Sequence, residues 1–368
     1  MRKALILCFV SLLVSCGDKA TTQGEPNVPT VRATEGEIAP FEFSASTNIA
    51  WLTDSSLAVI DNDDQQIVIV TTTGVEVSRI GRKGMGPGEF TGLLPLRVNA
   101  KGELLVADVL SMRLSRFDAD HNYVASVSVP APPSEILDWN EDRAVVMMVP
   151  FMATQGPTVG IVDFEAGSLV SSFSVFEKDS GLALPVENAP VPGMLLTYLA
   201  ATSLRTGAYA FASPLRYRIV VMDDAGRHID TFERPEVERV MPSEEEMREA
   251  EAKIRKMAAT LNPPPPPEAL ESWMGMIRAP KPHFRYHGFA TDDEGRLWIV
   301  TERGDAQSTA IDVLDSDGGF LTTMVLPHHV RGMAFRSSML ATLVERKGGD
   351  FDGQFAIHLY EVTIAPGS

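Results

Sequence analysis

Apolar and polar residues alternate along most of the chain, in short runs separated by small polar turns. Five segments share one form, in which two stretches of alternating apolar residues flank a turn of Asp, Gly and other small residues. They are IVIVTTTGVEVSRI (67–80), LSRFDADHNYVASV (114–127), VGIVDFEAGSLVSSF (159–173), RIVVMDDAGRHIDTF (218–232) and IDVLDSDGGFLTTM (311–324). Alternation with a period of two on both sides of a Gly-type turn predicts β-hairpins.

A second element precedes these hairpins. VNAKGELLVADV (98–109) and ATDDEGRLWIVTE (290–302) each place a Gly turn before an apolar strand, and SSLAVIDND (55–63) and SSMLATLVE (337–345) are weaker copies. Each repeat therefore contains four short strands within about 40–47 residues. Repeats of this length and strand content predict the blades of a β-propeller.

We expect an all-β fold, a six-bladed β-propeller of four-stranded blades over residues 31–368. The predicted blades cover about 41–80, 92–130, 133–176, 194–234, 284–326 and 330–365. The last repeat has only three strands, so its outer strand is expected from TVRATEGEI (30–38), which would close the ring and remove an exposed sheet edge. The third repeat is the weakest copy, which leaves a seven-bladed arrangement open.

One segment breaks the strand pattern, and we expect it to be a helical insertion at about 236–281, between blades four and five. PSEEEMREAEAKIRKMAATLN (242–262) has apolar residues at helical spacing, and Ser243 with Glu246 forms a capping box. PPPPP at 263–267 ends this helix, and EALESWMGMI (268–277) predicts a second short one. The insertion is interpreted as a flap packed on the propeller, with a lid or a partner-binding arm as alternatives.

The chain begins with MRKALILCFVSLLVSC, a basic start followed by an apolar run too short to span a membrane. Residues 1–15 therefore predict a secretory leader. The tetrad at 13–16 resembles the bacterial lipobox, which implies lipidation of Cys16, a flexible tether over 16–30 and a lipid-mediated membrane contact. An ordinary signal peptide is the alternative. Gly17 resembles outer-membrane sorting, so the expected location is the cell envelope, on the outer membrane facing the periplasm.

Composition adds two exclusions. The net charge of −17 over 368 residues disfavours nucleic acid as a partner, because an acidic surface repels phosphates. The only two cysteines are Cys8, inside the leader, and Cys16. The predicted mature chain therefore has no thiol for a disulfide, a metal site or nucleophilic catalysis.

GRKGMGPGEF (81–90) is the most distinctive stretch between repeats. A phosphate loop needs a Lys followed by Ser or Thr after the glycines and then a helix, whereas Lys83 precedes them and a strand pattern follows Phe90. We interpret the stretch as a blade connector, with Phe90 packed between blades. A stretch of this kind, between the outer strand of one blade and the inner strand of the next, resembles the connectors of the NHL-type six-bladed propellers found in bacterial lipoproteins. Residues 213–232 and 293–300 also resemble segments of those proteins.

That resemblance suggests where chemistry would lie, at the central channel. Peptidyl-amidating lyases of the NHL-type fold bind zinc there through three histidines, and His287 and His329 could supply two, but no third is found in blades one to four. Calcium-dependent lactonase-type propellers use channel carboxylates. The Asp-rich stretches at 61–66, 315–319 and 348–353 are instead interpreted as turns, since none has the calcium-loop pattern.

Three arginines, Arg97, Arg285 and Arg331, lie near the expected starts of inner strands, where they could bind an anionic group or form salt bridges between blades. With His287 and His329 they are the candidate ligand-binding residues. The leading hypothesis is a non-enzymatic, lipid-anchored propeller that binds a small molecule or a protein, with no catalytic residue and no cofactor. The alternatives are an NHL-type lyase or hydrolase with zinc or calcium in the channel, and an envelope assembly component that docks through the helical insertion.

Overall fold

The computed structural model describes residues 30–41, 46, 48–149, 156–175, 199–204, 206–212, 215–261, 263–304, 308–346 and 354–365. The expected leader, Cys16 and all but the last residue of the tether lie outside these ranges. Within them, no helix combines the length and apolar character needed to cross a membrane.

Six four-stranded antiparallel sheets follow one another along the chain. The first two sheets contain β2 (Ile49–Thr53), β3 (Ser56–Asp61), β4 (Gln66–Thr71) and β5 (Glu76–Ile80), then β8 (Leu93–Val98), β9 (Leu104–Asp108), β10 (Arg113–Phe117) and β11 (Tyr123–Ser128). The next two contain β12 (Pro133–Trp139), β13 (Arg143–Met148), β14 (Thr158–Asp163) and β15 (Ser168–Ser174), then β16 (Ala200–Ser203), β17 (Tyr209–Ala212), β18 (Arg218–Met222) and β19 (His228–Glu233). The last two contain β20 (Phe284–Thr291), β21 (Leu297–Thr301), β22 (Thr309–Leu314) and β23 (Phe320–Leu326), then β24 (His329–Arg336), β25 (Met339–Glu345), β26 (Phe355–Ala365) and β1 (Thr30–Phe41).

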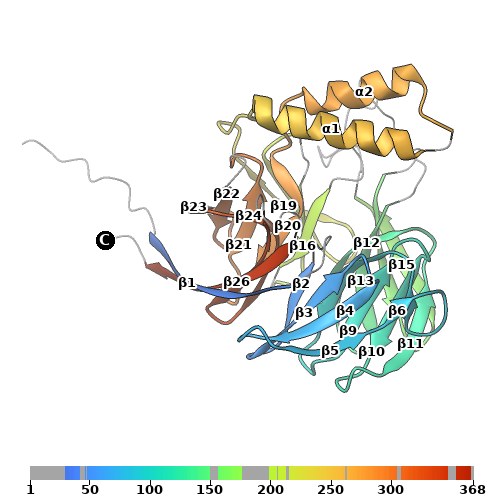
Figure 1. The fold of residues 1–368 in the computed structure, drawn as a ribbon. Coiled ribbons are helices and arrows are strands. Elements are labelled where there is room, and N and C mark those ends of the chain that lie inside the picture. The colour runs from blue at the N-terminus through green and yellow to red at the C-terminus, as the bar shows by residue number, and fades with distance from the viewer. Residues whose placement is uncertain are drawn as a thin grey trace, which may run out of the picture.

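The sheets are arranged as the blades of a six-bladed β-propeller (Figure 1). The first strand of each blade contacts the first strands of both neighbours, and β24 contacts β2, so the ring is closed around a central channel. The described strands begin and end close to the predicted blade limits. The six-bladed prediction is confirmed.

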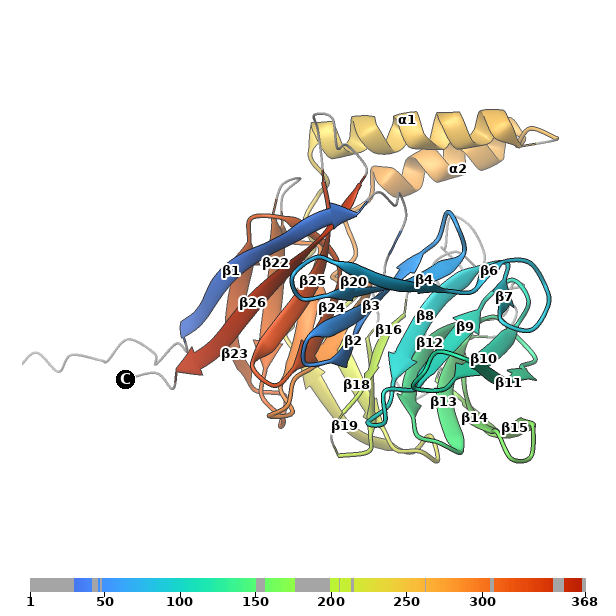
Figure 2. The same cartoon turned by 60° about the horizontal axis from the view of Figure 1, so that its bottom comes forward.

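Blade six combines the two ends of the described chain. β1 pairs antiparallel with β26, from Thr30 opposite Ala365 to Phe41 opposite Phe355, and becomes the outer strand of that blade. Figures 1 and 2 show these two long strands side by side at one edge of the ring. The pairing supplies partners for one edge of β26 that would otherwise be open.

Two helices, α1 (Glu244–Thr260) and α2 (Pro267–Ile277), connect blade four to blade five and pack against each other. Both views show them lying across one face of the propeller (Figures 1 and 2). The capping box at the start of α1 is present, because Ser243 and Glu246 each bond the other's backbone N–H. Lys281 ties the pair to the ring: its Nζ lies 2.9 Å from Glu246 Oε1 and 3.1 Å from the Gly304 carbonyl oxygen.

The core is divided into six apolar clusters, one between each pair of neighbouring blades. The middle strands carry side chains buried on both faces; β9, for example, is buried at all five residues. Outer strands alternate exposed and buried positions, since only one of their faces meets a neighbouring blade.

The connector at 81–90 is held by hydrogen bonds from its own side chains and from Arg113 of β10. Glu89 accepts a hydrogen bond from the Gly86 N–H at 2.8 Å and another from Arg82 Nε at 2.8 Å. Gly81 has φ +82°, and a Cβ there would lie 2.2 Å from the Phe90 ring. Strand β8, not a helix, follows, so the interpretation as a blade connector is confirmed.

His283, just before β20, predicts a pH-dependent stability. Burial, with nearby Arg239 and Arg303, lowers the pKa of His283 to about 4. An unfolded histidine takes up its proton near pH ~6.5. Between these pH values only the unfolded state gains the proton, so the free energy of unfolding is expected to fall by about 1.4 kcal/mol per pH unit as pH decreases. The contribution is fully present above the unfolded pKa.

Urea unfolding between pH 7 and pH 4 measures this effect as the difference between the wild type and His283→Gln. The two pH profiles should converge by about 3 kcal/mol toward pH 4. His228→Gln, at an exposed histidine, is the matched control and should follow the wild-type slope. Parallel profiles for the wild type and His283→Gln would contradict the prediction.

Candidate functional site

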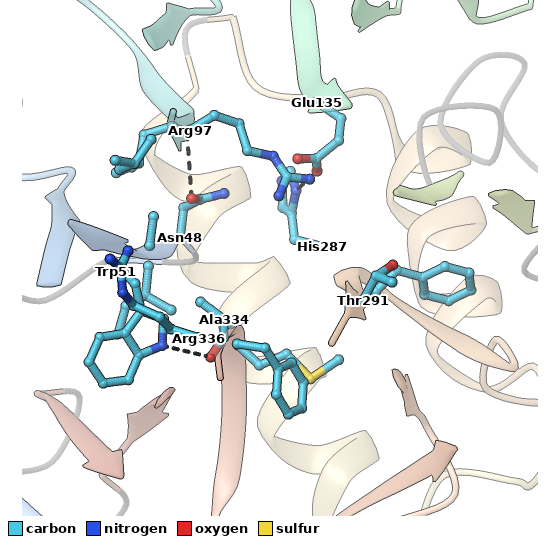
Figure 3. A pocket seen from close by; sticks show the side chains of 16 residues that line it. Asn48, Trp51, Arg97, Glu135, His287, Thr291, Ala334 and Arg336 are labelled. Atoms are coloured by element: carbon cyan, nitrogen blue, oxygen red, sulfur yellow. Dashed lines mark hydrogen bonds and ion pairs between the residues drawn. The ribbon is translucent and has the colours of Figure 1, made fainter. Parts of the chain in front are cut away.

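The central channel contains a pocket of about 230 Å³ with a mainly polar lining. Its walls come from the first strands of five blades, and Figure 3 shows the side chains converging on one space. The lining residues lie mostly in the later halves of β8, β20 and β24, together with residues 48–51 at the start of β2. The helices connect to the start of β20, so they sit at the opposite end of these inner strands (Figure 2).

His287 enters this pocket from an irregular stretch of β20. Pairing with β21 is regular only at Phe284 and from Phe289 onward, so residues 285–288 form a bulge. His287 has φ +57°, a conformation that costs a non-glycine residue on the order of 1 kcal/mol or more. Gly288 permits the bend, since a Cβ there would lie 2.8 Å from the Arg285 carbonyl oxygen. The bulge turns the imidazole away from the regular strand direction.

The imidazole is fixed by a carboxylate from another blade. His287 Nδ1 lies 2.6 Å from Glu135 Oε2, and the two side chains are 3% and 10% exposed. The Tyr286 ring lies against the imidazole at a centroid distance of 3.8 Å, and its hydroxyl donates to the Ser134 carbonyl oxygen at 3.2 Å. We assign a proton to Nδ1, because Glu135 can only accept there when ionised.

The other ring nitrogen, His287 Nε2, is buried and has no hydrogen-bond partner among the described residues. Buried polar atoms are nearly always hydrogen-bonded, so an exception that faces a pocket marks a position for a ligand or water. In the neutral imidazole Nε2 is an acceptor, and in the protonated ring it is a donor.

Arg97 is the second polar group of the pocket. The prediction that it lies at the start of an inner strand is wrong, since it is the last residue but one of β8, which bulges between Leu93 and Leu96. Its Nε donates to the Ile136 carbonyl oxygen in the next blade at 2.7 Å. Within the described chain this is its one hydrogen bond, and it has no ion pair. In Figure 3 its side chain extends toward Glu135 and His287.

The remaining walls are held by short polar contacts between blades. Trp51 Nε1 donates to the Ala334 carbonyl oxygen at 3.1 Å, and Asn48 Oδ1 accepts from the Leu96 N–H at 3.4 Å. Arg336, at the end of β24, is paired with Asp54. These contacts fix the shape of the pocket, and among the described residues they leave the two terminal nitrogens of Arg97 and His287 Nε2 available to a ligand.

The other three candidates are placed outside this lining. Arg285 forms a two-pronged ion pair with Glu302 at 2.8 and 3.0 Å, and Arg331 Nε pairs with Glu345 at 2.7 Å. Each ion pair lies within a single blade, the first in blade five and the second in blade six, and not between blades as the sequence analysis suggested. Burial opposes ionisation of Glu302, but Arg285, Lys281 and His329 together lower its pKa below the usual value. The five candidates therefore do not form one site: Arg97 and His287 line the pocket, and the other three do not.

A metal site does not form from the candidates. His287 lines the pocket and His329 does not, and the described residues contain no group of three or more His, Cys, Asp or Glu able to hold an ion. Asp61 Oδ1 and Asp315 Oδ1 accept backbone N–H bonds within their own turns, as turn residues do. The turn at 348–353 lies outside the described residues.

Sequence reasoning missed Glu135, Asn48 and Trp51. Glu135 lies in APPSEILDW, where one acidic residue precedes an apolar strand and resembles any solvated edge position. Its partner is 152 residues away, so the pairing depends on the blade geometry. The available signal was positional: Glu135 occupies the start of an inner strand, as Arg285 and Arg331 do.

Residues 40–181 match the model of a family described as a 6-bladed beta-propeller. The protein is a six-bladed β-propeller. The matched segment covers the first three blades, and the three remaining sheets complete the same architecture. No curated protein sequence matches the chain significantly.

Solved structures show the same fold at low sequence identity. A member of the duf4221 family from Bacteroides vulgatus superposes with a TM-score of 0.59 at 10% identity, covering 93% of this propeller and 100% of that chain. A structural genomics protein of unknown function from Bacteroides thetaiotaomicron gives 0.54 at 10% identity, covering 91% and 76%. A gluconolactonase from Xanthomonas campestris gives 0.54 at 12% identity, covering 91% and 95%. At such identities the likeness extends to the fold alone.

Proposed function

We propose that this propeller binds a small polar molecule in its central channel. The observation that supports the proposal most directly is the orientation of His287. Its backbone has a left-handed conformation and its Nδ1 contacts Glu135, so that the buried Nε2, which has no partner among the described residues, faces the pocket. Strained, buried polar groups are costly and persist mainly where they serve a site. The volume of about 230 Å³ suits a metabolite smaller than drug-sized ligands, whose pockets are about 300–1,000 Å³.

A second candidate function uses the same pair of side chains, His287 and Glu135. An imidazole whose Nδ1 is oriented by a carboxylate and whose Nε2 faces a pocket has the geometry of a general base. This observation favours a proton-transfer enzyme as the alternative to a binding protein. A metal-dependent lyase or hydrolase has less support, because His287 has no partner ligands among the described residues. Turnover of a bound ligand, lost in His287→Gln, would select the enzyme.

Filling the pocket tests the proposed function without altering its charges. Ala334 lines the channel, so Ala334→Trp should place an indole in the binding space and weaken any channel ligand by at least about tenfold. The measurement is a thermal-shift screen of a small-metabolite library, followed by direct titration of the hits. Val77→Trp adds the same side chain on the exposed strand β5 and is the matched control. Hits that bind Ala334→Trp as tightly as Val77→Trp would place the ligand elsewhere.

We further propose that the propeller is carried on the cell envelope by a lipid on Cys16. Support comes from the leader-like residues 1–15 and the lipobox resemblance alone. We expect the wild type to incorporate labelled palmitate and to sediment with membranes, and Cys16→Ser to do neither. Cys8→Ser, inside the leader, is the matched control and should behave as the wild type. Equal labelling of Cys16→Ser and the wild type would refute the anchor.

A further inference from the structure

We propose that the channel ligand is a small anion, a carboxylate or a phosphate, held between the Arg97 guanidinium and a protonated His287 imidazole, so that binding takes up one proton. This proposal rests on the proposed channel binding and specifies its chemistry. It follows from the geometry of three side chains contributed by three different blades: Arg97 on β8, Glu135 on β12 and His287 on β20.

The charges in the pocket lead to this class of ligand. Arg336 is already paired with Asp54, so the remaining lining charges are Arg97, Glu135 and whatever charge His287 carries. With a neutral imidazole, Arg97 and Glu135 cancel. With a protonated imidazole one positive charge is left, which a ligand carrying one negative charge balances. An unbalanced charge in a confined site is costly, so proton and anion should enter together.

Hydrogen bonding requires the same pairing. Glu135 occupies His287 Nδ1, which leaves Nε2 as the atom available to a ligand. An anionic oxygen only accepts hydrogen bonds, so it can meet Nε2 only when that nitrogen carries a proton. Arg97 has its Nε committed to Ile136, and its two terminal nitrogens can still donate to the same oxygens.

Charged groups on the other inner strands leave this balance unchanged. β24 brings Arg331, which is paired with Glu345, and β20 itself brings Arg285, which is paired with Glu302. His329, at the start of β24, interacts with Glu302. The strands β2 and β16 contain no ionisable side chain. The proton that accompanies the anion is therefore assigned to His287.

The test is calorimetric titration of the purified full chain with succinamate and with dimethyl phosphate, each of which carries one negative charge, and with succinamide as the neutral analogue. We expect one of the two anions to bind and succinamide to bind at least 10-fold more weakly. Repeating the titration at pH 8 in buffers of different ionisation enthalpy should show close to one proton taken up per ligand. On the alkaline side, Kd should rise about tenfold per pH unit.

Variants locate the effect. Arg97→Gln and His287→Gln should each weaken binding about 10- to 100-fold, since each removes a hydrogen bond to a charged group. Arg331→Gln removes an inner-strand arginine that does not line the pocket and should stay within about 2-fold of the wild type. Thermal denaturation verifies that the variants fold. If one of them does not, the number of protons that the wild type takes up per bound ligand still tests the proposal.

Glu135→Gln separates this mechanism from a merely structural role of the pair. Glutamine removes the negative charge, and its amide nitrogen can donate to His287 Nδ1, so that a neutral imidazole carries its one proton on Nε2, facing the anion. Arg97 alone then balances the anion, so binding should persist while proton uptake falls toward zero and Kd loses its pH dependence. In ¹⁵N-histidine NMR, the His287 ring should carry protons on both nitrogens in the wild-type complex and on one in Glu135→Gln.

The proposal is overturned if succinamide binds as tightly as succinamate, or if an anion binds with no proton uptake. A neutral metabolite that binds the wild type and is lost in Ala334→Trp would defeat the anion proposal while leaving channel binding intact. Anion binding with one proton taken up, but undiminished in Ala334→Trp, would instead refute the channel as its location.

Discussion

Replacing Asp312 by alanine is expected to destabilise the folded protein by about 3–5 kcal/mol, because it leaves two cations without their buried counter-ion. Asp312 is fully buried in β22. It accepts hydrogen bonds from the Tyr217 hydroxyl at 2.7 Å, from Thr323 Oγ1 at 2.6 Å and from Arg234 at 3.2 Å, and it also pairs with Arg303. No other described carboxylate joins so many side chains at one blade junction.

Equilibrium urea unfolding of Asp312→Ala and the wild type measures the loss. Asp317→Ala, at an exposed aspartate in the following turn, is the matched control and should change the free energy of unfolding by less than about 0.5 kcal/mol. Asp312→Asn keeps the shape and one acceptor, so it should fall between them. A loss below 1 kcal/mol in Asp312→Ala would show that Arg234 and Arg303 find water or other acceptors instead.

The network joins blade four to blade five, where the helical insertion interrupts the repeat. Burial, followed by the neighbouring Asp312, raises the pKa of the Tyr217 hydroxyl, which therefore stays a donor at any physiological pH. The Arg234 guanidinium lies over the Phe320 ring at 3.6 Å and over the Tyr217 ring at 5.4 Å. Asp312, inside IDVLD, gave no sign of this in the sequence, because its partners Tyr217 and Arg234 lie 95 and 78 residues away along the chain.

The architecture could be predicted because each blade repeats one local pattern. Period-two alternation around Asp–Gly turns depends on neighbouring residues, and six copies reinforced one another. The third repeat was the weakest copy, yet β12 to β15 form a complete sheet. Its Gly160 lies in the middle of β14, where a Cβ would meet Leu169 and Met148 at 2.5 Å. Close packing, not a turn, accounts for that glycine.

The site was predicted only in part, for a physical reason. His287 and Arg97 were identified because inner strands line a propeller channel, but Arg285 and Arg331 satisfied the same criterion and are paired with Glu302 and Glu345. Distinguishing side chains that are available to a ligand from those that are already paired requires knowing the partner of each. When the partner lies on another strand, the register between the strands decides whether the two side chains meet. Between Phe284, opposite Thr301, and Phe289, opposite Ile299, β20 has three residues more than β21, and no periodic pattern encodes this bulge.

The connector at 81–90 leads to the second large effect: Phe90→Ala is expected to lower the free energy of unfolding by about 3–5 kcal/mol. Phe90 has no exposed surface and packs with Ile67, Leu104 and other apolar residues of blades one and two. Its ring lies 6.0 Å from that of Phe117, and Gly81 leaves no room for another side chain beside it.

Met85→Ala, in the same connector but 78% exposed, is the matched control and should change stability by less than about 0.5 kcal/mol. Urea unfolding followed by tryptophan fluorescence reports both variants, since Trp51 lies in blade one. A small effect of Phe90→Ala would mean that the blade junction closes over the cavity, and the connector would then be a spacer. A large one makes GPGEF the element that fixes blade two against blade one, because its glycines bring the chain close enough for Phe90 to enter the core.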